Sequence, residues 1–115
     1  MDPTSVTVKL RLDEGSLLPV EVDLLVDPDA PVTIVPGRVL RDVGVVPAGD
    51  QTVELGGGQK GARKVGQAYC QLLDREARTK VAFGEEGDRP RLGYETVEAC
   101  GLVIDPETRV VKAPR

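Results

Sequence analysis

The sequence predicts an all-β fold with one or two short helices, and two patterns support this prediction. Apolar residues alternate with polar ones along residues 6–12 and again along residues 17–26, which is the two-residue period of strands with one buried face. The turn-forming sequence DEGS lies between these two runs. We therefore expect the first two strands to pair as a hairpin.

Further strands are expected where short apolar runs are bounded by turn residues. These runs are VTIV, TVEL, ARKVGQAYCQLL, TKVAF and the two apolar parts of LVIDPETRVVK. The glycine-rich GGGQKG separates TVEL from the run that follows it, and DREAR is expected to be the turn before TKVAF. GEEGDRP is expected to be a polar loop, and DPET a turn.

Two short segments have the spacing of helices. In PGRVLRDVG, apolar residues recur at helical intervals between an initial proline and a final glycine. In LGYETVEACG, Val97 and Cys100 share one face, and Gly101 ends the segment. No linker, repeat or low-complexity tract divides the chain, so residues 1–115 are predicted to form a single domain.

The composition narrows the classes of function. The chain has 115 residues, 40% hydrophobic and 30% charged, which is near the size at which one core becomes self-sufficient, so association between copies would stabilise it. A formal charge of -4, with only two tyrosines and one phenylalanine as aromatic residues, argues against nucleic acid as a partner. Since there is neither a secretory leader nor an apolar stretch of about 18 residues, we expect a soluble, cytoplasmic chain without membrane contact.

The residue types also exclude some chemistry. The chain contains no histidine, which excludes His-dependent catalytic triads and His-ligated metal sites. Cys70 and Cys100 stand in apolar runs and are interpreted as reduced core thiols, with one disulfide between them as the alternative. We expect no cofactor and no resident metal.

The stretch LLVDPDAPVTIVP, residues 24–36, places two aspartates inside core-like sequence. Asp and Pro are ordinary turn formers, so a solvated turn is one interpretation. The other is that Asp27 is a catalytic acid or base at the end of a buried strand. The residue types of this stretch alone leave both interpretations open.

The order of these motifs resembles the retropepsin-like, or retroviral-type, aspartic protease family and its small prokaryotic members. Residues 27–30 read Asp-Pro-Asp-Ala where the family has Asp-Thr-Gly-Ala or Asp-Ser-Gly-Ala, and residues 33–35 read Thr-Ile-Val at the family's spacing. A glycine-rich hairpin at residues 52–66 resembles the flap, Leu-Gly at residues 92–93 resembles the hydrophobic-Gly turn, and GLVIDP resembles the ending of the prokaryotic members. The resemblance covers residues 5–112.

The resemblance implies a closed β-barrel with a flap hairpin, and peptide-bond hydrolysis by two facing aspartates. The chain has one such loop, so the dyad would combine Asp27 from each protomer of a homodimer, one carboxylate activating water and the other donating a proton to the peptide carbonyl. A peptide or protein substrate and no cofactor are implied too. The substrate-binding residues expected from the resemblance are Asp29, Ala30, Val32, Gly56, Gly57, Gly58, Arg91 and Leu92.

Three positions depart from the family's pattern. Pro28 replaces the Thr or Ser whose hydroxyl joins the two loops, Asp29 replaces a glycine, and Arg91 replaces an apolar residue. Arg91 is expected to reach Asp27 or Asp29, and an Asp29–Arg91 ion pair would replace the lost link between the loops. The alternative function is a catalytically inactive module of the same fold for peptide binding or dimerisation. A third is a Ca²⁺ or Mg²⁺ site built from Asp27 and Asp29 of both protomers.

Overall fold

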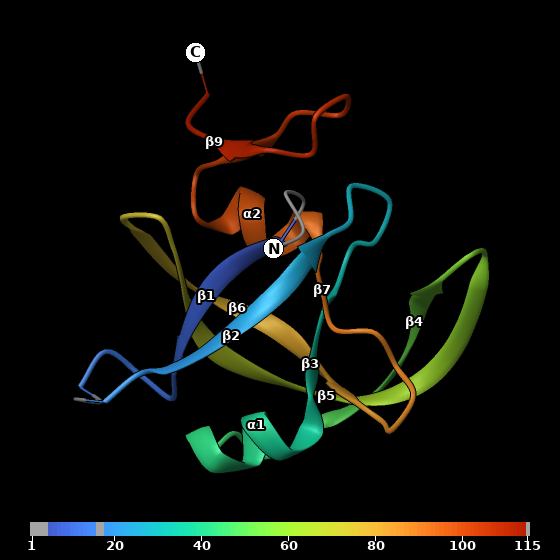
Figure 1. Cartoon of the computed structure of the whole chain (residues 1–115). Helices are drawn as coiled ribbons and strands as arrows, with labels where there is room; N and C mark the ends of the chain where they lie inside the picture. Colours follow the sequence, from blue (N-terminus) through green and yellow to red (C-terminus); the bar gives the residue numbers. More distant parts are fainter. Residues whose placement is uncertain (1–4, 16–17, 115) are drawn as a thin grey trace.

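The computed structural model describes residues 5–15 and 18–114, which are mostly strand with two short helices (Figure 1). In chain order, its elements are β1 (Ser5–Arg11), β2 (Val20–Val26), β3 (Thr33–Pro36), α1 (Gly37–Val43), β4 (Gly49–Gly56), β5 (Gln59–Leu72), β6 (Arg75–Gly84), β7 (Arg91–Leu92), α2 (Tyr94–Ala99), β8 (Val103–Ile104) and β9 (Val111–Lys112). The prediction of a β-rich chain with short helices is confirmed.

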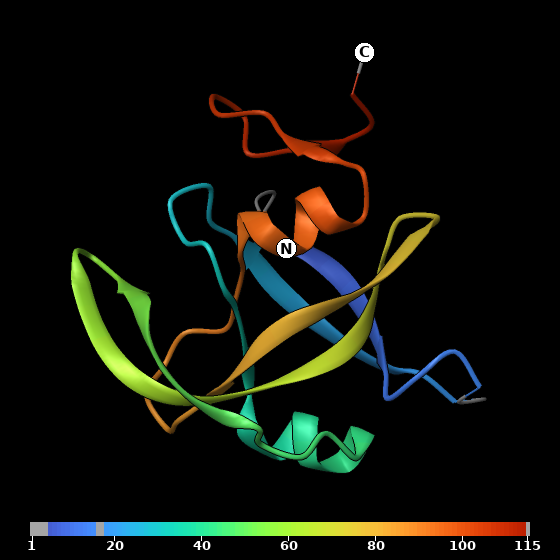
Figure 2. The same cartoon turned by 180° about the vertical axis from the view of Figure 1, so that it is seen from behind.

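Hydrogen bonds between the strands close a ring. β1 and β2 form the predicted antiparallel hairpin, from the pair Ser5 and Leu25 to the pair Leu10 and Val20. β1 also pairs with β5, so the strands β1-β2-β7-β3-β6-β5 return to their start. β4 lies outside this ring and, among the described strands, pairs only with β5 (Figure 2).

The interior of the ring is the main hydrophobic core, because the alternating strands direct one face inward. Val8, Leu10, Leu24 and Val26 of the first hairpin are 0–2% exposed, as the alternation predicted. A second, smaller cluster lies between β3 and the β4–β5 hairpin. Its buried members are Val32, Ile34, Val53 and Ala82, with Leu55 and Val65 packed against them.

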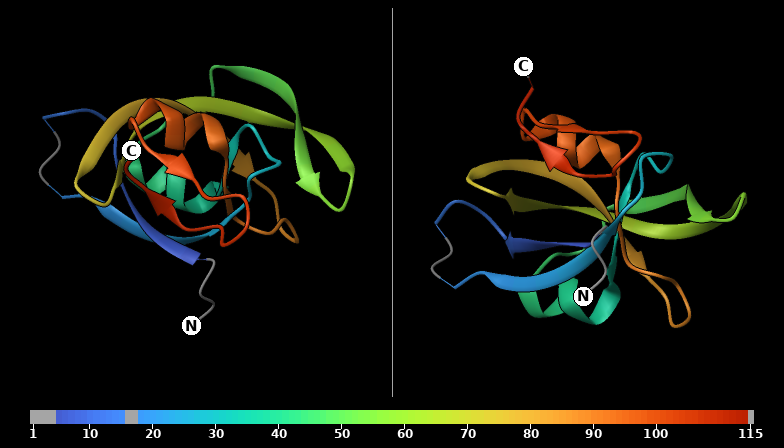
Figure 3. Two further views of the ribbon diagram at one scale, coloured as in Figure 1. Left: turned by 90° about the horizontal axis from the view of Figure 1, so that it is seen from above. Right: turned by 45° about the horizontal axis from the view of Figure 1, so that its top comes forward.

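The two helices lie on opposite sides of the strand ring (Figure 1). α1 ends at Gly44, whose φ of 102° is the left-handed conformation that glycine adopts without strain. Val97 on α2 and Cys100, which caps its C-terminus, are both buried, as the sequence predicted. The small β8–β9 hairpin lies beyond α2, with the predicted turn between its strands (Figure 3).

The predicted turn at DREAR is wrong. Leu72 pairs directly with Arg75, so Leu73 and Asp74 alone connect β5 to β6. A two-residue connection of this kind needs positive φ, and Leu73 supplies it at 55°. Leucine rarely adopts that conformation, so the residue types gave no sign of so tight a turn.

The two cysteines are buried free thiols, as interpreted from the sequence. Burial raises the pKa of Cys70 to about 12 and also raises that of Cys100. The Cys100 thiol lies 3.6 Å from the Cys70 carbonyl oxygen, to which it donates. Neither helix in the described residues has the length and apolar content that a membrane span requires.

Candidate functional site

Asp27 stands where β2 ends, and the strand order brings Arg91 beside it. β7 lies between β2 and β3, parallel to the first and antiparallel to the second. Arg91 is therefore the cross-strand partner of both Leu25 and Ile34. The Asp27 N–H donates to the Leu92 carbonyl at 3.1 Å, which continues the β2–β7 pairing by one residue. This hydrogen bond fixes the start of the loop between β2 and β3, residues 27–32, on β7. We call these residues the Asp27 loop.

The Asp27 carboxylate is held at both oxygens. Arg91 Nη1 lies 2.5 Å from Asp27 Oδ2, and the Asp29 N–H donates to Asp27 Oδ1 at 3.0 Å. The Arg91 and Asp27 side chains are only 11% and 16% exposed. The Coulomb attraction within a pair so far removed from water is stronger than at the surface, and removing one partner leaves a poorly solvated charge.

The far end of the Asp27 loop packs tightly against Gly93. A Cβ at Gly93 would lie 2.5 Å from the Pro31 carbonyl oxygen, so only glycine allows this approach. The Gly93 N–H donates to Thr33 Oγ1 at 2.9 Å, and that buried hydroxyl is 2.6 Å from Thr96 Oγ1. The Tyr94 N–H also donates to the Ala30 carbonyl at 2.8 Å. The loop is thus fixed at its start, by β7, and at its end, by the residues that lead into α2.

The glycine-rich hairpin predicted at residues 52–66 exists and its tip lies over Arg91. β4 and β5 pair from Gly49 with Val65 to Gly56 with Gln59. Gly56 and the two glycines that follow it all have positive φ. A Cβ at Gly56 would lie 2.6 Å from Arg91 Nη2, so the backbone of the tip contacts the guanidinium.

A second ion pair ties the hairpin to the loop between β6 and β7. Arg63 on β5 binds Asp88 through two nitrogens, Nε at 2.7 Å and Nη2 at 2.8 Å. The Glu85 N–H also donates to Asp88 Oδ2 at 2.7 Å. The hydrogen bonds from Arg63, aided by the one from Glu85, lower the pKa of Asp88, and the same contact raises the pKa of Arg63.

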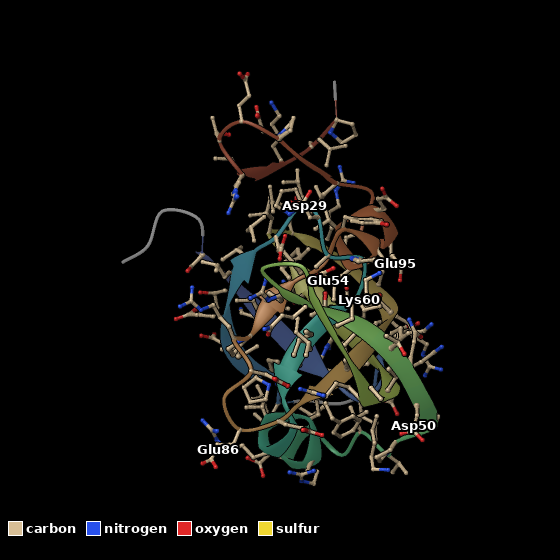
Figure 4. The ribbon with its side chains drawn as sticks, turned by 90° about the vertical axis from the view of Figure 1, so that its right-hand side faces the viewer. Asp29, Asp50, Glu54, Lys60, Glu86 and Glu95 are labelled. Carbon is tan, nitrogen blue, oxygen red and sulfur yellow. The ribbon has the colours of Figure 1, made fainter. Side chains whose placement is uncertain are left out.

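A groove of about 440 Å³ separates the Asp27 loop from the hairpin. We call it the loop–hairpin groove; its lining residues are Asp29, Pro31, Val32, Gln51, Thr52, Val53, Glu54 and Lys60. Side chains alternate between the two faces of a strand, yet the four consecutive residues 51–54 all line the groove. It therefore runs along the outer edge of β4, which pairs with no other described strand. Figure 4 shows the labelled Asp29, Glu54 and Lys60 near one another on this side of the molecule.

Apart from Arg91, the substrate-binding residues predicted from the resemblance divide into three groups. Asp29 and Val32 line the loop–hairpin groove. Gly56 contacts Arg91, and a Cβ at Gly57 or Gly58 would meet nothing within 4 Å.

The third group is fully buried. Ala30 and Leu92 are each 0% exposed within one chain, because the Asp27 loop packs tightly on β7 and on the segment after it. Their expected role in substrate binding stays a prediction.

Arg91 reaches Asp27, one of its two expected partners. The expected pairing of Asp29 with Arg91 is absent from the described chain, where the Asp29 side chain is exposed and only its backbone N–H bonds to Asp27. Glu54 and Lys60 were not predicted as site residues. These two residues face each other across the β4–β5 hairpin. The three glycines between them mark the turn, so the sequence could have predicted this pairing.

Within the described residues of one chain, no group of three or more Cys, Asp and Glu side chains is arranged to hold a metal ion. Comparisons of the chain with protein-family models, with curated proteins and with solved structures each gave no match. The function therefore has to be argued from the site itself.

Proposed function

We propose that this chain is a retropepsin-like domain that binds extended peptides as a homodimer without hydrolysing them. The observation that supports this function best is the 2.5 Å contact between Arg91 and Asp27 beneath the hairpin. The ring of strands, the hairpin at residues 49–65 and the position of Asp27 after β2 agree with the closed barrel, flap and catalytic loop that the resemblance implies.

Hydrolysis by two aspartates requires that they share one proton, which they do because two neighbouring negative charges repel each other. A two-fold dimer of this chain would bring two Arg91 side chains together with two Asp27 side chains. Each carboxylate then has its own cation, so the repulsion that retains the shared proton is removed. Pro28 has neither a hydroxyl nor an N–H to link the two loops.

Peptide binding is supported by the free edge of β4. The outer edge of this strand carries backbone N–H and C=O groups that bond to no other described strand. An extended peptide can add to such an edge as a further strand, and its side chains then enter the adjoining loop–hairpin groove. Val32 and Val53 supply an apolar wall for these side chains.

The test combines binding and cleavage on one set of labelled octapeptide mixtures. We expect the wild-type chain to sediment as a dimer and to bind the peptides, with no cleavage detected by mass spectrometry between about pH 4 and pH 6. The triple variant Pro28→Thr, Asp29→Gly, Arg91→Leu restores the family's residues and is expected to cleave. Adding Asp27→Asn to that variant should abolish the cleavage. A wild-type chain that binds no peptide would overturn the proposal.

The second candidate is an active homodimeric aspartic endopeptidase. It is favoured by the hydrogen bond from the Asp29 N–H, which orients the Asp27 carboxylate, and by the 16% exposure that leaves this side chain within reach of a substrate. Wild-type cleavage that is lost on Asp27→Asn would establish this candidate in place of the first. Cleavage that survives Asp27→Asn would point to a contaminating enzyme.

A further inference from the structure

Three charged side chains around the loop–hairpin groove lack charged partners. In the described part of the chain, the Asp29 carboxylate and the Lys60 ammonium make no hydrogen bond or ion pair. Glu54 accepts only a long hydrogen bond, 3.3 Å, from the Gly56 N–H. Glu54 and Lys60 are directly opposed across the hairpin, yet their charged groups do not pair. The groove therefore holds three charges that are free to meet a charged ligand.

We propose that the loop–hairpin groove selects peptides that carry an arginine or lysine side chain, received by Asp29 from the loop and Glu54 from the hairpin. This inference rests on the proposed function, because it names the peptide that the same site takes. Asp29 belongs to the loop between β2 and β3, and Glu54 to β4, so the two carboxylates come from the two walls of the groove.

Charge and shape both favour a long cationic side chain. Two carboxylates and one ammonium line the groove, so its net charge is negative, as is that of the whole chain at -4. Arg and Lys place an apolar stem against apolar surface and keep the charged head at its polar rim. Pro31, Val32 and Val53 provide that apolar surface. An acidic peptide would find Lys60 as its only cation in this groove and two carboxylates against it.

The experiment measures which charge the groove prefers. Three fluorescent octapeptide mixtures carry Arg, Gln or Glu at one central position and equal amounts of Ala, Val, Leu, Ser and Thr elsewhere. Binding to the chain of residues 1–115 is followed by fluorescence anisotropy at low and at physiological salt. We expect the Arg mixture to bind roughly fivefold more tightly than the Gln mixture at low salt, with a smaller ratio at higher salt because exposed charges are screened.

Variants locate the preference in the groove. Asp29→Asn and Glu54→Gln should each reduce the Arg-to-Gln ratio about two- to threefold, and Lys60→Gln should increase it by a similar factor. Matched controls are Asp42→Asn and Glu86→Gln, which remove the same charges from exposed positions that neither line the groove nor belong to β4. These controls should leave the ratio unchanged, and thermal melting verifies that every variant is folded.

The outcomes separate this inference from the proposed function. Equal binding of the three mixtures, or tighter binding of the Glu mixture, overturns the charge preference and leaves peptide binding intact. The inference is also overturned if both controls reduce the preference for Arg as much as the groove variants do. The preference would then come from the net charge of the chain and not from the groove. If no mixture binds, the proposed function and this inference fail together.

Discussion

Two arginine–aspartate pairs flank the β4–β5 hairpin, and they differ in geometry although not in burial. The Arg63 and Asp88 side chains are 14% and 11% exposed, and those of Arg91 and Asp27 are 11% and 16% exposed. The first pair uses two guanidinium nitrogens and two carboxylate oxygens. The second uses one of each, and Arg91 adds only a 3.3 Å hydrogen bond from its Nε to the Arg89 carbonyl.

We interpret the bidentate Arg63–Asp88 pair as structural and the one-point Arg91–Asp27 pair as part of the candidate site. A bidentate pair holds its partners in one geometry, and Asp88 further accepts the Glu85 N–H within its own loop. The one-point contact of Arg91 leaves Nη2 beside Gly56 at the hairpin tip. We therefore expect the first pair to contribute more to stability and the second more to what the site binds.

The largest expected effect is on stability. Arg63→Met should lower the free energy of unfolding by about 2–3 kcal/mol, because it leaves the mostly buried Asp88 carboxylate without its cation. Arg91→Met should cost less, about 1 kcal/mol, because it removes a one-point ion pair and one long hydrogen bond, and the Asp27 carboxylate keeps the hydrogen bond from the Asp29 N–H. Urea unfolding measures both. The exposed Arg38→Met is the control, expected to change stability by less than about 0.5 kcal/mol, and equal losses at positions 63 and 91 would contradict the distinction.

A part of the first effect should depend on pH. Hydrogen bonds from Arg63 and from the Glu85 N–H lower the pKa of Asp88 below its ordinary value of 3.8. A lowered pKa means that the stabilisation is complete above pH 3.8 and is lost as the pH falls below it toward the lowered value. The stability gap between wild type and Asp88→Asn should therefore be smaller at about pH 3 than at about pH 6, with the narrowing confined to pH values near and below 3.8. A gap that stays constant or widens on acidification would contradict this assignment.

A third prediction concerns the hairpin tip over Arg91. Gly56 and Gly58 both have positive φ, but only a Cβ at Gly56 would contact the guanidinium. Gly56→Ala should therefore cost about 1 kcal/mol more than the control Gly58→Ala. In an Arg91→Met background we expect this excess to shrink. If the two alanine variants are equally stable in the wild-type background, the hairpin tip does not contact Arg91.

The smallest expected effect tests the missing Asp29–Arg91 pair. Asp29→Asn and Arg91→Met should be additive in stability to within about 0.5 kcal/mol, because the Asp29 carboxylate does not touch Arg91. Asp27→Asn and Arg91→Met should instead show a coupling of about 1 kcal/mol. A larger coupling for Asp29 than for Asp27 would reverse this assignment of partners.

Local patterns in the sequence predicted most of the elements. Alternation identified the β1–β2 hairpin, and helical spacing together with Gly44 identified α1. These local patterns could not predict pairings between distant segments. Examples are the pairing of β1 with β5 and the position of β7 between β2 and β3. The turn at Leu73 was missed because its residue type is unusual for the conformation that it adopts.

For the candidate site, the resemblance indicated that Arg91 would approach Asp27 or Asp29, and the strand order selects Asp27. The Arg63–Asp88 pair could not be predicted from the sequence, because the two residues are neither spaced as neighbours on a helix nor opposed in a hairpin. Glu54 and Lys60 were missed for a different reason: their roles depend on how closely the loop approaches β4, which is a property of the folded ring.

The insertion of β7 between β2 and β3 also bears on how the chain folds. Leu25 pairs with Arg91, and Thr33 with Val81, so these strands cannot complete their hydrogen bonds until most of the chain has been synthesised. Pairings between distant segments slow folding, and we expect a rate constant toward the slow end of the range for small domains. The N-terminal hairpin can form early, but Asp27 meets its arginine only when β7 enters the sheet. Assembly of the site thus coincides with closure of the ring.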